Sequence, residues 1–181
     1  MRRAQSLMLM AALIAAAAGA RAQDGAPGTP RGELFGGYSY FRAGDAGTGL
    51  NGGDFSIAEN VNRWFGGALD LSSHHGSFAG SGVNVTTIAY GPVFSYRRDP
   101  RFTPFFHVLL GAVRGSSGYL GISLPDTEFA ITGGGGVDVK LGKHLAVRVI
   151  QADYISSHFL SKTQNNFRLS AGLVFRFGFR R

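Results

Sequence analysis

The stretch FRLSAGLVFRF, residues 167–177, decides the fold class of this chain. Successive side chains of an extended strand point to opposite faces. One face therefore carries Phe167, Leu169, Ala171, Leu173, Phe175 and Phe177. The other face carries Arg168, Ser170, Gly172, Val174 and Arg176. A large apolar face backed by charged and small residues is unusual for a water-soluble edge strand. It is typical of a strand with lipid outside and a polar barrel lumen inside.

The start of the chain has the composition of an export signal. Arg2 and Arg3 precede an apolar run from Leu7 to about Ala18, and residues 20–22 (Ala-Arg-Ala) supply a small-x-small cleavage site. The run is shorter than the ~20 residues of a spanning helix, which argues against a membrane anchor. A lipoprotein is excluded because the chain has no cysteine to acylate. We expect a cleaved signal peptide at 1–22, a periplasmic lead-in at 23–31 and a barrel domain at 32–181.

The composition of the remaining chain excludes several classes. Removing the three arginines of the signal lowers the formal charge from +7 to +4, and the remaining cations are scattered as single residues and short pairs. A nucleic-acid partner is therefore not indicated. The absence of cysteine excludes thiolate chemistry and Cys-ligated metal, and it is compatible with an exported protein that its sheet stabilises.

Eight runs have strand character and none keeps a helical period. They span 32–41, 53–60, 64–73, 84–96, 102–114, 129–141, 144–156 and 165–177. Lipid cannot satisfy an open sheet edge, so the sheet must close. The sequence predicts an all-β fold, an eight-stranded antiparallel up-and-down transmembrane β-barrel.

The connections between these runs alternate in length. The connections at 42–52, 74–83, 115–128 and 157–164 are long and rich in Gly, Ser, Thr and Asn, whereas 61–63, 97–101 and 142–143 are short. Membrane barrels have short periplasmic turns and longer external loops, so we expect both termini in the periplasm. The periplasmic rim is then cationic, with Arg63, Arg97, Arg98, Arg101 and Lys143.

Large aromatic residues cluster near the strand ends, where amphipathic rings favour the membrane interface. We place Trp64, Tyr96, Phe102 and Phe177 toward the periplasmic interface, and Tyr40, Phe129 and Phe159 toward the outer one. The alternative is a soluble sandwich or a lipocalin-like barrel in which these aromatics form the core. The export signal, the last strand and the alternating connections together favour the membrane barrel.

One pattern resembles a known assembly signal, and a second resembles a known protein family. Ser170, Gly172, Phe175 and Phe177 resemble the C-terminal signal that the barrel assembly machinery recognises, although Gly178-Phe179-Arg180-Arg181 follow it and Phe179 is a second candidate for the last aromatic. The mature chain is similar to small eight-stranded barrels related to the membrane domain of outer membrane protein A. The matching pieces are 35–40 (FGGYSY), 104–105, 133–138, 151–154 (QADY) and the last strand.

This resemblance implies an integral protein of the cell outer membrane and no single activity. It implies outer-membrane lipid and lipopolysaccharide as surroundings, and the barrel assembly machinery and periplasmic chaperones as partners during biogenesis. Nothing in the sequence indicates an oligomeric state.

Inward-facing charges are expected to pair, because a buried charge without a partner is costly. Hairpin geometry places Asp138 opposite Arg148 and Asp153 near Arg168. Glu33 and Arg176 form a third pair that joins the first strand to the last. Arg148 and Asp153 have opposite parity, so we expect a β-bulge near Val149-Ile150. The same register places Asp54 directly opposite Asp70.

The other polar motifs predict no catalytic residue, metal ligand or cofactor. Gly133–Gly136 lack the Lys-Ser/Thr and the helix of a phosphate loop and are interpreted as a strand. His74-His75 are interpreted as part of a solvated loop, because nothing supplies a third catalytic partner or an oxyanion hole. His107 is expected to face the lumen as a hydrogen-bonded interior histidine.

The sequence therefore favours an outer-membrane barrel with a structural or surface-interaction role, a plugged polar lumen and external loops that carry any binding. One alternative is an outer-membrane enzyme, such as a lipid A acyl hydrolase or a protease. Another is a small-solute pore, although eight strands leave little room for a channel whereas porins use about 16–18.

Overall fold

A computed structural model describes residues 28–44, 47, 49–78, 81–119, 122–159 and 162–179. The expected signal peptide at 1–22 lies outside the described residues. Among the described residues, no helix is long and apolar enough to cross a membrane.

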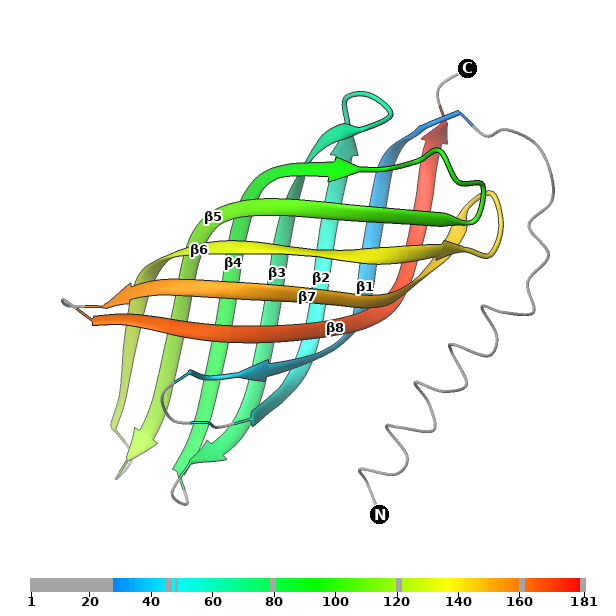
Figure 1. Cartoon of the computed structure of the whole chain (residues 1–181). Helices are drawn as coiled ribbons and strands as arrows, with labels where there is room; N and C mark the ends of the chain where they lie inside the picture. Colours follow the sequence, from blue (N-terminus) through cyan, green and yellow to red (C-terminus); the bar gives the residue numbers. More distant parts are fainter. Residues whose placement is uncertain are drawn as a thin grey trace, which may run out of the picture.

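Eight antiparallel strands form one closed barrel in sequence order (Figure 1). The last strand pairs with the first along most of its length, from Pro30 opposite Phe179 to Arg42 opposite Phe167. The predicted eight-stranded up-and-down topology is therefore confirmed. The strands are β1 (Pro30–Arg42), β2 (Gly49–Asn60), β3 (Phe65–Phe78), β4 (Ser81–Ser95), β5 (Phe102–Tyr119), β6 (Ile122–Lys140), β7 (Leu145–Phe159) and β8 (Lys162–Phe179).

The outer surface of the barrel carries a continuous apolar band. In β8 the outward residues from Phe167 to Phe177 are exposed at every second position except Ala171, which is half-buried, and the buried residues between them include Arg168 and Arg176. The other strands repeat this division; Tyr90 of β4, for example, is 65% exposed. Apolar side chains outside and charged side chains inside are the arrangement that a lipid environment requires.

Three of the four segments that were expected as long loops are largely strand. Pairing continues to Phe78 opposite Ser81, to Tyr119 opposite Ile122 and to Phe159 opposite Lys162. Beyond the apolar band the outward residues become polar, as at His75 and Arg114, so these hairpins protrude past the band as sheet. Figure 1 shows these hairpin ends on the side of the barrel away from the start of β1. We call this end of the barrel the protruding end.

The opposite end carries the connections 61–64, 96–101 and 141–144, together with the start of β1 and the end of β8. We call it the turn end. Two of its turns are closed by side-chain caps. Asn62 Oδ1 accepts hydrogen bonds from the amides of Trp64 and Phe65, at 2.9 and 2.8 Å. Asp99 Oδ1 accepts bonds from the amides of Arg101 and Phe102, at 2.7 and 2.8 Å. The short turns were expected here, within one or two residues.

At the turn end, two strand limits differ from expectation by two residues. β1 begins at Pro30, inside the expected lead-in, and β8 continues past Phe177 to Phe179. Gly178 adopts a left-handed φ of 65°, which interrupts the ladder for one residue and suits glycine. The ring of Phe179 then packs edge-on against His144, with the ring centroids 5.2 Å apart.

The expected β-bulge is present in β7. Val137 pairs with Ile150 whereas Asp138 pairs with Arg148, which leaves Val149 as the extra residue. The register of β2 and β3 was wrong by two residues, because Asp54 lies opposite Ser72 and Asp70 lies opposite Ser56.

Candidate functional site: the barrel lumen

The lumen near the protruding end is crossed by an apolar layer that the sequence did not reveal. Six buried side chains form it, and each comes from a different strand. Phe41 also packs against the ring of His74, with centroids 5.2 Å apart, which extends the layer to β3. The expectation of a polar lumen is therefore correct only for the space between this layer and the turn end. The six residues of the layer are Phe41, Leu50, Val85, Val113, Ala130 and Ile155.

Below this layer a single guanidinium organises the middle of the lumen. Arg168 is fully buried and donates from Nη1 to Asp70 Oδ1 at 2.8 Å and from Nε to Asp153 Oδ2 at 2.9 Å. Its Nη1 also lies 3.7 Å from Asp54 Oδ1. His107 Nε2 lies 2.9 Å from the other oxygen of Asp153. We call Arg168, Asp54, Asp70, Asp153 and His107 the Arg168 network.

A chain of hydroxyl groups leads from this network toward the apolar layer. Ser170 Oγ donates to Asp54 Oδ2 at 2.7 Å and lies 2.9 Å from Ser39 Oγ, which in turn lies 2.9 Å from His74 Nε2. His74 was expected in a solvated loop, but it is fully buried on the inward face of β3. The expectation was wrong because β3 extends through His74 and His75 to Phe78, so side chains in this polar segment still alternate between the lumen and the exterior. His75 points outward, as alternation requires, and its Nδ1 lies 2.9 Å from Asn84 Oδ1.

The contact between Ser39 and His74 does not make a catalytic site. Both residues are fully buried, so a substrate has no approach to the hydroxyl group. His74 Nδ1 has no hydrogen-bond partner, whereas a serine nucleophile needs a histidine that an acid orients. In the part of the chain that the structure describes, no group of three or more His, Cys, Asp or Glu side chains could hold a metal ion.

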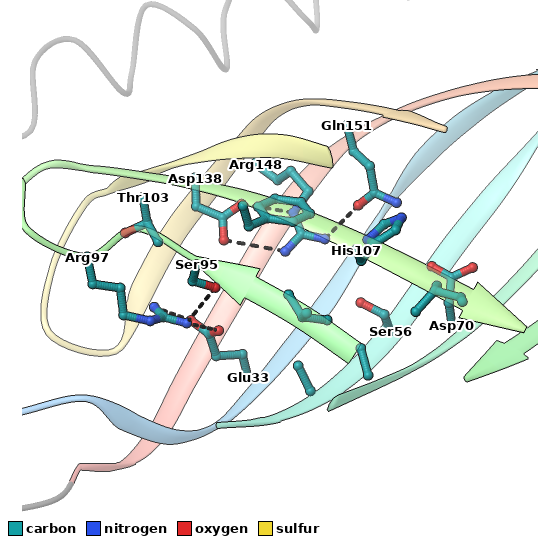
Figure 2. A pocket seen from close by; sticks show the side chains of 15 residues that line it. Glu33, Ser56, Asp70, Ser95, Arg97, Thr103, His107, Asp138, Arg148 and Gln151 are labelled. Atoms are coloured by element: carbon teal, nitrogen blue, oxygen red, sulfur yellow. Dashed lines mark hydrogen bonds and ion pairs between the residues drawn. The ribbon is translucent and has the colours of Figure 1, made fainter. Parts of the chain in front are cut away.

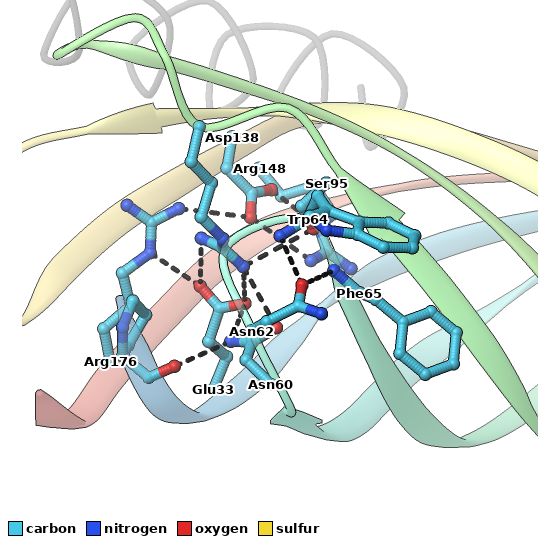
Figure 3. A network of polar contacts seen from close by, with 11 residues as sticks. Glu33, Asn60, Asn62, Trp64, Phe65, Ser95, Asp138, Arg148 and Arg176 are labelled. Carbon is cyan, nitrogen blue, oxygen red and sulfur yellow. Dashed lines mark hydrogen bonds and ion pairs between the residues drawn. The ribbon is translucent and has the colours of Figure 1, made fainter. Parts of the chain in front are cut away.

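A second network occupies the lumen at the turn end (Figure 3). Glu33 accepts hydrogen bonds from Arg176 Nε at 2.8 Å and from Arg97 Nη2 at 2.7 Å, and a third from Asn60 Nδ2 at 3.2 Å. Arg176 Nη2 also lies 3.6 Å from Asp138 Oδ2. We call Glu33, Arg97, Arg176, Asp138 and Arg148 the Glu33 network.

Arg148 joins the two networks through Gln151. It donates from Nε to Asp138 at 2.8 Å and from Nη1 to Gln151 Oε1 at 2.7 Å, and Gln151 Nε2 donates to Asp153 at 2.8 Å. The guanidinium is sandwiched between the rings of Phe35 and Phe105, with its Cζ 4.3 and 4.2 Å from their centroids. Cation–π contacts of this kind stabilise a desolvated arginine.

A cavity of about 30 Å³ lies between these side chains (Figure 2). It is lined by charged and polar groups that include Glu33 and Arg97 of the Glu33 network, His107 of the Arg168 network, and Gln151 between them. One bound water needs roughly 10–15 Å³ by this measure and two to four polar partners. The cavity therefore has room for a few waters and none for a larger solute.

The structure brings together all three ion pairs that the sequence suggested. Asp138 with Arg148, Asp153 with Arg168, and Glu33 with Arg176 each approach to 2.7–2.8 Å. Sequence reasoning missed Arg97, which it placed on the exposed rim; the residue follows β4 and turns back into the lumen to reach Glu33. It also missed the roles of Asp54, Asp70 and Gln151, because these depend on the registers of three different hairpins.

The other predicted residues have the following positions. Trp64, Tyr96, Phe102 and Phe129 are 49–59% exposed, the first three at the turn end. On β8, Ser170 and Gly172 face the barrel lumen, while Phe175 and Phe177 face outward. A side chain at Gly172 would collide with the backbone of β1 at Gly36 and Gly37, so glycine permits the closure of the barrel. Gly133–Gly136 lie inside β6, as expected, and the side chain of Phe159 lies outside the described residues.

Comparisons with solved structures identify similar barrels. Neisserial surface protein A superposes with a TM-score of 0.70 at 14% identity, over 81% of this chain and 97% of that one. Ail, the attachment invasion locus protein of Yersinia pestis, gives 0.56 at 17% identity, over 81% and 99%. The N-terminal β-barrel domain of Pseudomonas aeruginosa OprF gives 0.56 at 16% identity, over 83% and 99%. At these identities the likeness establishes the fold alone.

No curated protein sequence matches the chain. A family profile does: that of the outer membrane protein beta-barrel domain, which matches residues 7–177. The profile covers nearly the whole chain, and the closed barrel with its outward apolar band agrees with it. The chain therefore belongs to the outer membrane protein beta-barrel domain family and is an integral β-barrel of the outer membrane.

Proposed function

We propose that this protein is a sealed surface barrel: its lumen passes no solute, and its protruding hairpins carry an interaction surface outside the cell. The observation that supports sealing is the apolar layer of six side chains from six strands. Water and ions enter a dry apolar constriction at a high free-energy cost. The two salt-bridged networks lie in the lumen beneath it.

The protruding hairpins support the proposed interaction role. They continue as paired sheet beyond the apolar band and present polar residues such as His75, Asn84 and Arg114 on their outward faces. Ail, a structurally similar barrel, has also been solved in complex with the heparin analogue sucrose octasulfate. For the present chain we propose only the location of the surface. External, polar and rigid hairpins are suited to contact with a partner.

The sealing of the lumen is tested by conductance. The purified barrel, inserted into a planar bilayer, should show no steps above the lipid baseline. Replacing Phe41 and Leu50 by serine opens the apolar layer and should produce measurable conductance if that layer is the seal. Steady conductance of the wild-type protein would overturn the proposal in favour of a small pore.

The placement of the hairpins is tested on intact cells. An epitope inserted between Tyr119 and Ile122 should be stained by antibody without permeabilisation. The same epitope inserted into the turn 141–144 should be stained only after the outer membrane is opened. The reverse pattern would put the termini outside the cell and contradict the proposed surface.

An enzymatic role has less support, since the buried pair of Ser39 and His74 is shielded and lacks an acid. Lipid A mass spectra from cells with and without the protein would detect an acyl hydrolase. Identical spectra are expected.

We further propose that residues 1–22 direct export and are removed, and that Ser170, Gly172, Phe175 and Phe177 act as the assembly signal. Phe177→Asp should reduce insertion into the outer membrane more than Phe179→Asp, because Phe177 belongs to the apolar band and Phe179 follows the left-handed Gly178. Heat-modifiable migration of membrane fractions measures insertion. Greater sensitivity at Phe179 would move the signal two residues along the chain.

A further inference from the structure

The turn end carries six cations, four in its turns and two, Arg31 and Lys140, at inward positions of β1 and β6 by the mouth of the lumen. Five are exposed and Lys140 is half-buried. None of the six forms a salt bridge with any residue that the structure describes. They are Arg31, Arg63, Arg98, Arg101, Lys140 and Lys143, and we call them the cationic rim.

Few acids balance the rim. Among the described residues of this end that lie outside the Glu33 network, the acids are Glu59 and Asp99, so six cations face two carboxylates. Asp99 is engaged by the amides of its own turn, which hold its pKa below the usual range; the bond from Phe102 contributes most and that from Arg101 next. The rim therefore has a formal excess of four positive charges that no described residue of this end neutralises.

Aromatic rings hold part of this charge next to the apolar band. The Cζ of Arg98 lies 5.9 Å from the ring centroid of Tyr96, and the Nζ of Lys143 lies 5.4 Å from that of Phe179. Arg63 adjoins Trp64, which is 59% exposed and stacks on Phe94. Tyrosine and tryptophan at the edge of an apolar band mark the depth of lipid headgroups. Arg63, Arg98 and Lys143 therefore lie at the level of the lipid phosphates.

We propose that the cationic rim binds anionic phospholipids of the leaflet it faces, that is, phosphodiester headgroups without a balancing amine. Guanidinium groups donate paired, charge-assisted hydrogen bonds to phosphate oxygens. A zwitterionic headgroup carries its own cation, which the rim repels. The excess of unpaired arginine and lysine therefore favours the anionic lipid, and the preference should weaken with salt because exposed charges are screened.

The chain contains its own reporter for this site, because Trp64 is its one tryptophan. The mature barrel is folded into vesicles of phosphatidylcholine and phosphatidylglycerol, in which one lipid or the other carries brominated acyl chains that quench tryptophan fluorescence. At equal mole fraction, the brominated anionic lipid should quench Trp64 several-fold more effectively than the brominated zwitterionic lipid. Molar salt should remove most of the difference.

Matched variants test the assignment. Replacing Arg63, Arg98 and Arg101 together by glutamine should abolish the preference, since these residues lie in the two turns nearest Trp64 in the chain. The control replaces Arg42 and Arg114 by glutamine; both are exposed beyond the other edge of the band, and the preference should persist. Heat-modifiable migration shows that each variant is folded, and the salt series on the wild-type protein stands without any variant.

Equal quenching by the two lipids at low salt would overturn the proposal. So would a preference that survives the triple substitution undiminished, because that variant removes three of the six rim cations and lowers the formal excess from four charges to one. Protection of Trp64 by a soluble anionic glycan, with no difference between the lipids, would also overturn it and would indicate a periplasmic polymer as the partner.

Discussion

In the middle of the lumen one guanidinium serves three carboxylates, whereas at the turn end three guanidiniums serve two carboxylates. The formal charge is −2 for the Arg168 network with His107 neutral and +1 for the Glu33 network. Arg168 and its three aspartates are buried in strands, but Arg97 of the Glu33 network comes from a turn and its side chain is 10% exposed.

The difference shows how a narrow barrel can tolerate unbalanced charge. Gln151 connects the two networks without adding charge, and the opposite excesses lie close enough to attract each other. Each carboxylate of the Glu33 network has more than one cation nearby, so the loss of one cation leaves another. The aspartates of the Arg168 network share a single cation, so its loss leaves all of them uncompensated.

The largest effect is expected for Arg168→Met. Removing one partner of a buried ion pair costs about 3–5 kcal/mol, and this change removes the partner of Asp70 and Asp153 together. The free energy of unfolding, from urea titrations in lipid vesicles, should fall by about 5 kcal/mol or the barrel should fail to fold. A loss below about 1 kcal/mol would mean that Arg168 is not the shared cation.

An intermediate effect is expected for Asp138→Ala, which leaves Arg148 with Gln151 and two aromatic rings but without its carboxylate. The loss should be about 3 kcal/mol, at the low end for a broken buried pair. The double change Asp138→Ala with Arg148→Met should recover much of it, because an apolar pair can replace a buried ion pair at little cost. Additive losses in the same urea titrations would show that the two residues do not interact.

A smaller loss is expected for Arg97→Gln. Glu33 keeps Arg176 and Asn60 as donors, so the change should cost about 1.5–2 kcal/mol, at the low end for a hydrogen bond to a charged group. Arg98→Gln in the same turn is the control and should change stability little, because that side chain is exposed. Equal losses in the two variants would remove Arg97 from the network.

The smallest effect within the lumen is expected for Asp54→Asn. Asp54 lies 3.7 Å from Arg168, and an asparagine oxygen can still accept the bond from Ser170. The change also reduces the negative excess, so stability should shift by less than about 1 kcal/mol. Asp70→Asn is the matched control and should cost clearly more, since it weakens a 2.8 Å contact with Arg168. A reversed order of these two variants would reverse the assigned roles.

The smallest contribution to stability is expected from Asp99, an exposed carboxylate in a turn outside the lumen. The amides of Phe102 and Arg101 hold the pKa of Asp99 below its ordinary value of 3.8, so they favour the ionised form in the folded turn. This stabilisation is complete above the unfolded pKa and is lost as the pH falls through the lowered, folded pKa. NMR shifts of the two amides should titrate below the ordinary aspartate range, and Asp99→Ala should abolish that titration. Titration at the ordinary value would show that the caps are not formed in solution.

The features that sequence could predict are those carried by local alternation. The two faces of β8, the eight strands and the bulge near Val149 follow from side-chain parity, and parity survives errors in loop length. The pairs of Asp138 with Arg148 and Asp153 with Arg168 lie in adjacent strands, where a hairpin centre is enough to place them.

The remaining features required the closed barrel. Asp70 and Arg168 lie on strands that are not neighbours, so no hairpin register brings them together. The apolar layer draws one inward residue from each of six strands, and a single residue such as Leu50 gives no periodic signal. The hairpin ends were taken for loops because outside the lipid both strand faces are polar, and the alternation that marks a strand disappears.

The extra residue in β7 has a consequence for how this chain can change in evolution. Arg148 and Gln151 both face the lumen although they are three positions apart, because Val149 is the additional residue between them. Deleting Val149 would leave an ordinary strand in which Arg148, Gln151 and Asp153 still face inward. Deleting Ala152, beyond the bulge, would instead turn Asp153 and Ile155 toward lipid and Tyr154 into the lumen. Strand β7 can therefore lose a residue at the bulge and keep both networks, whereas the same loss further along the strand would remove members of the Arg168 network and of the apolar layer.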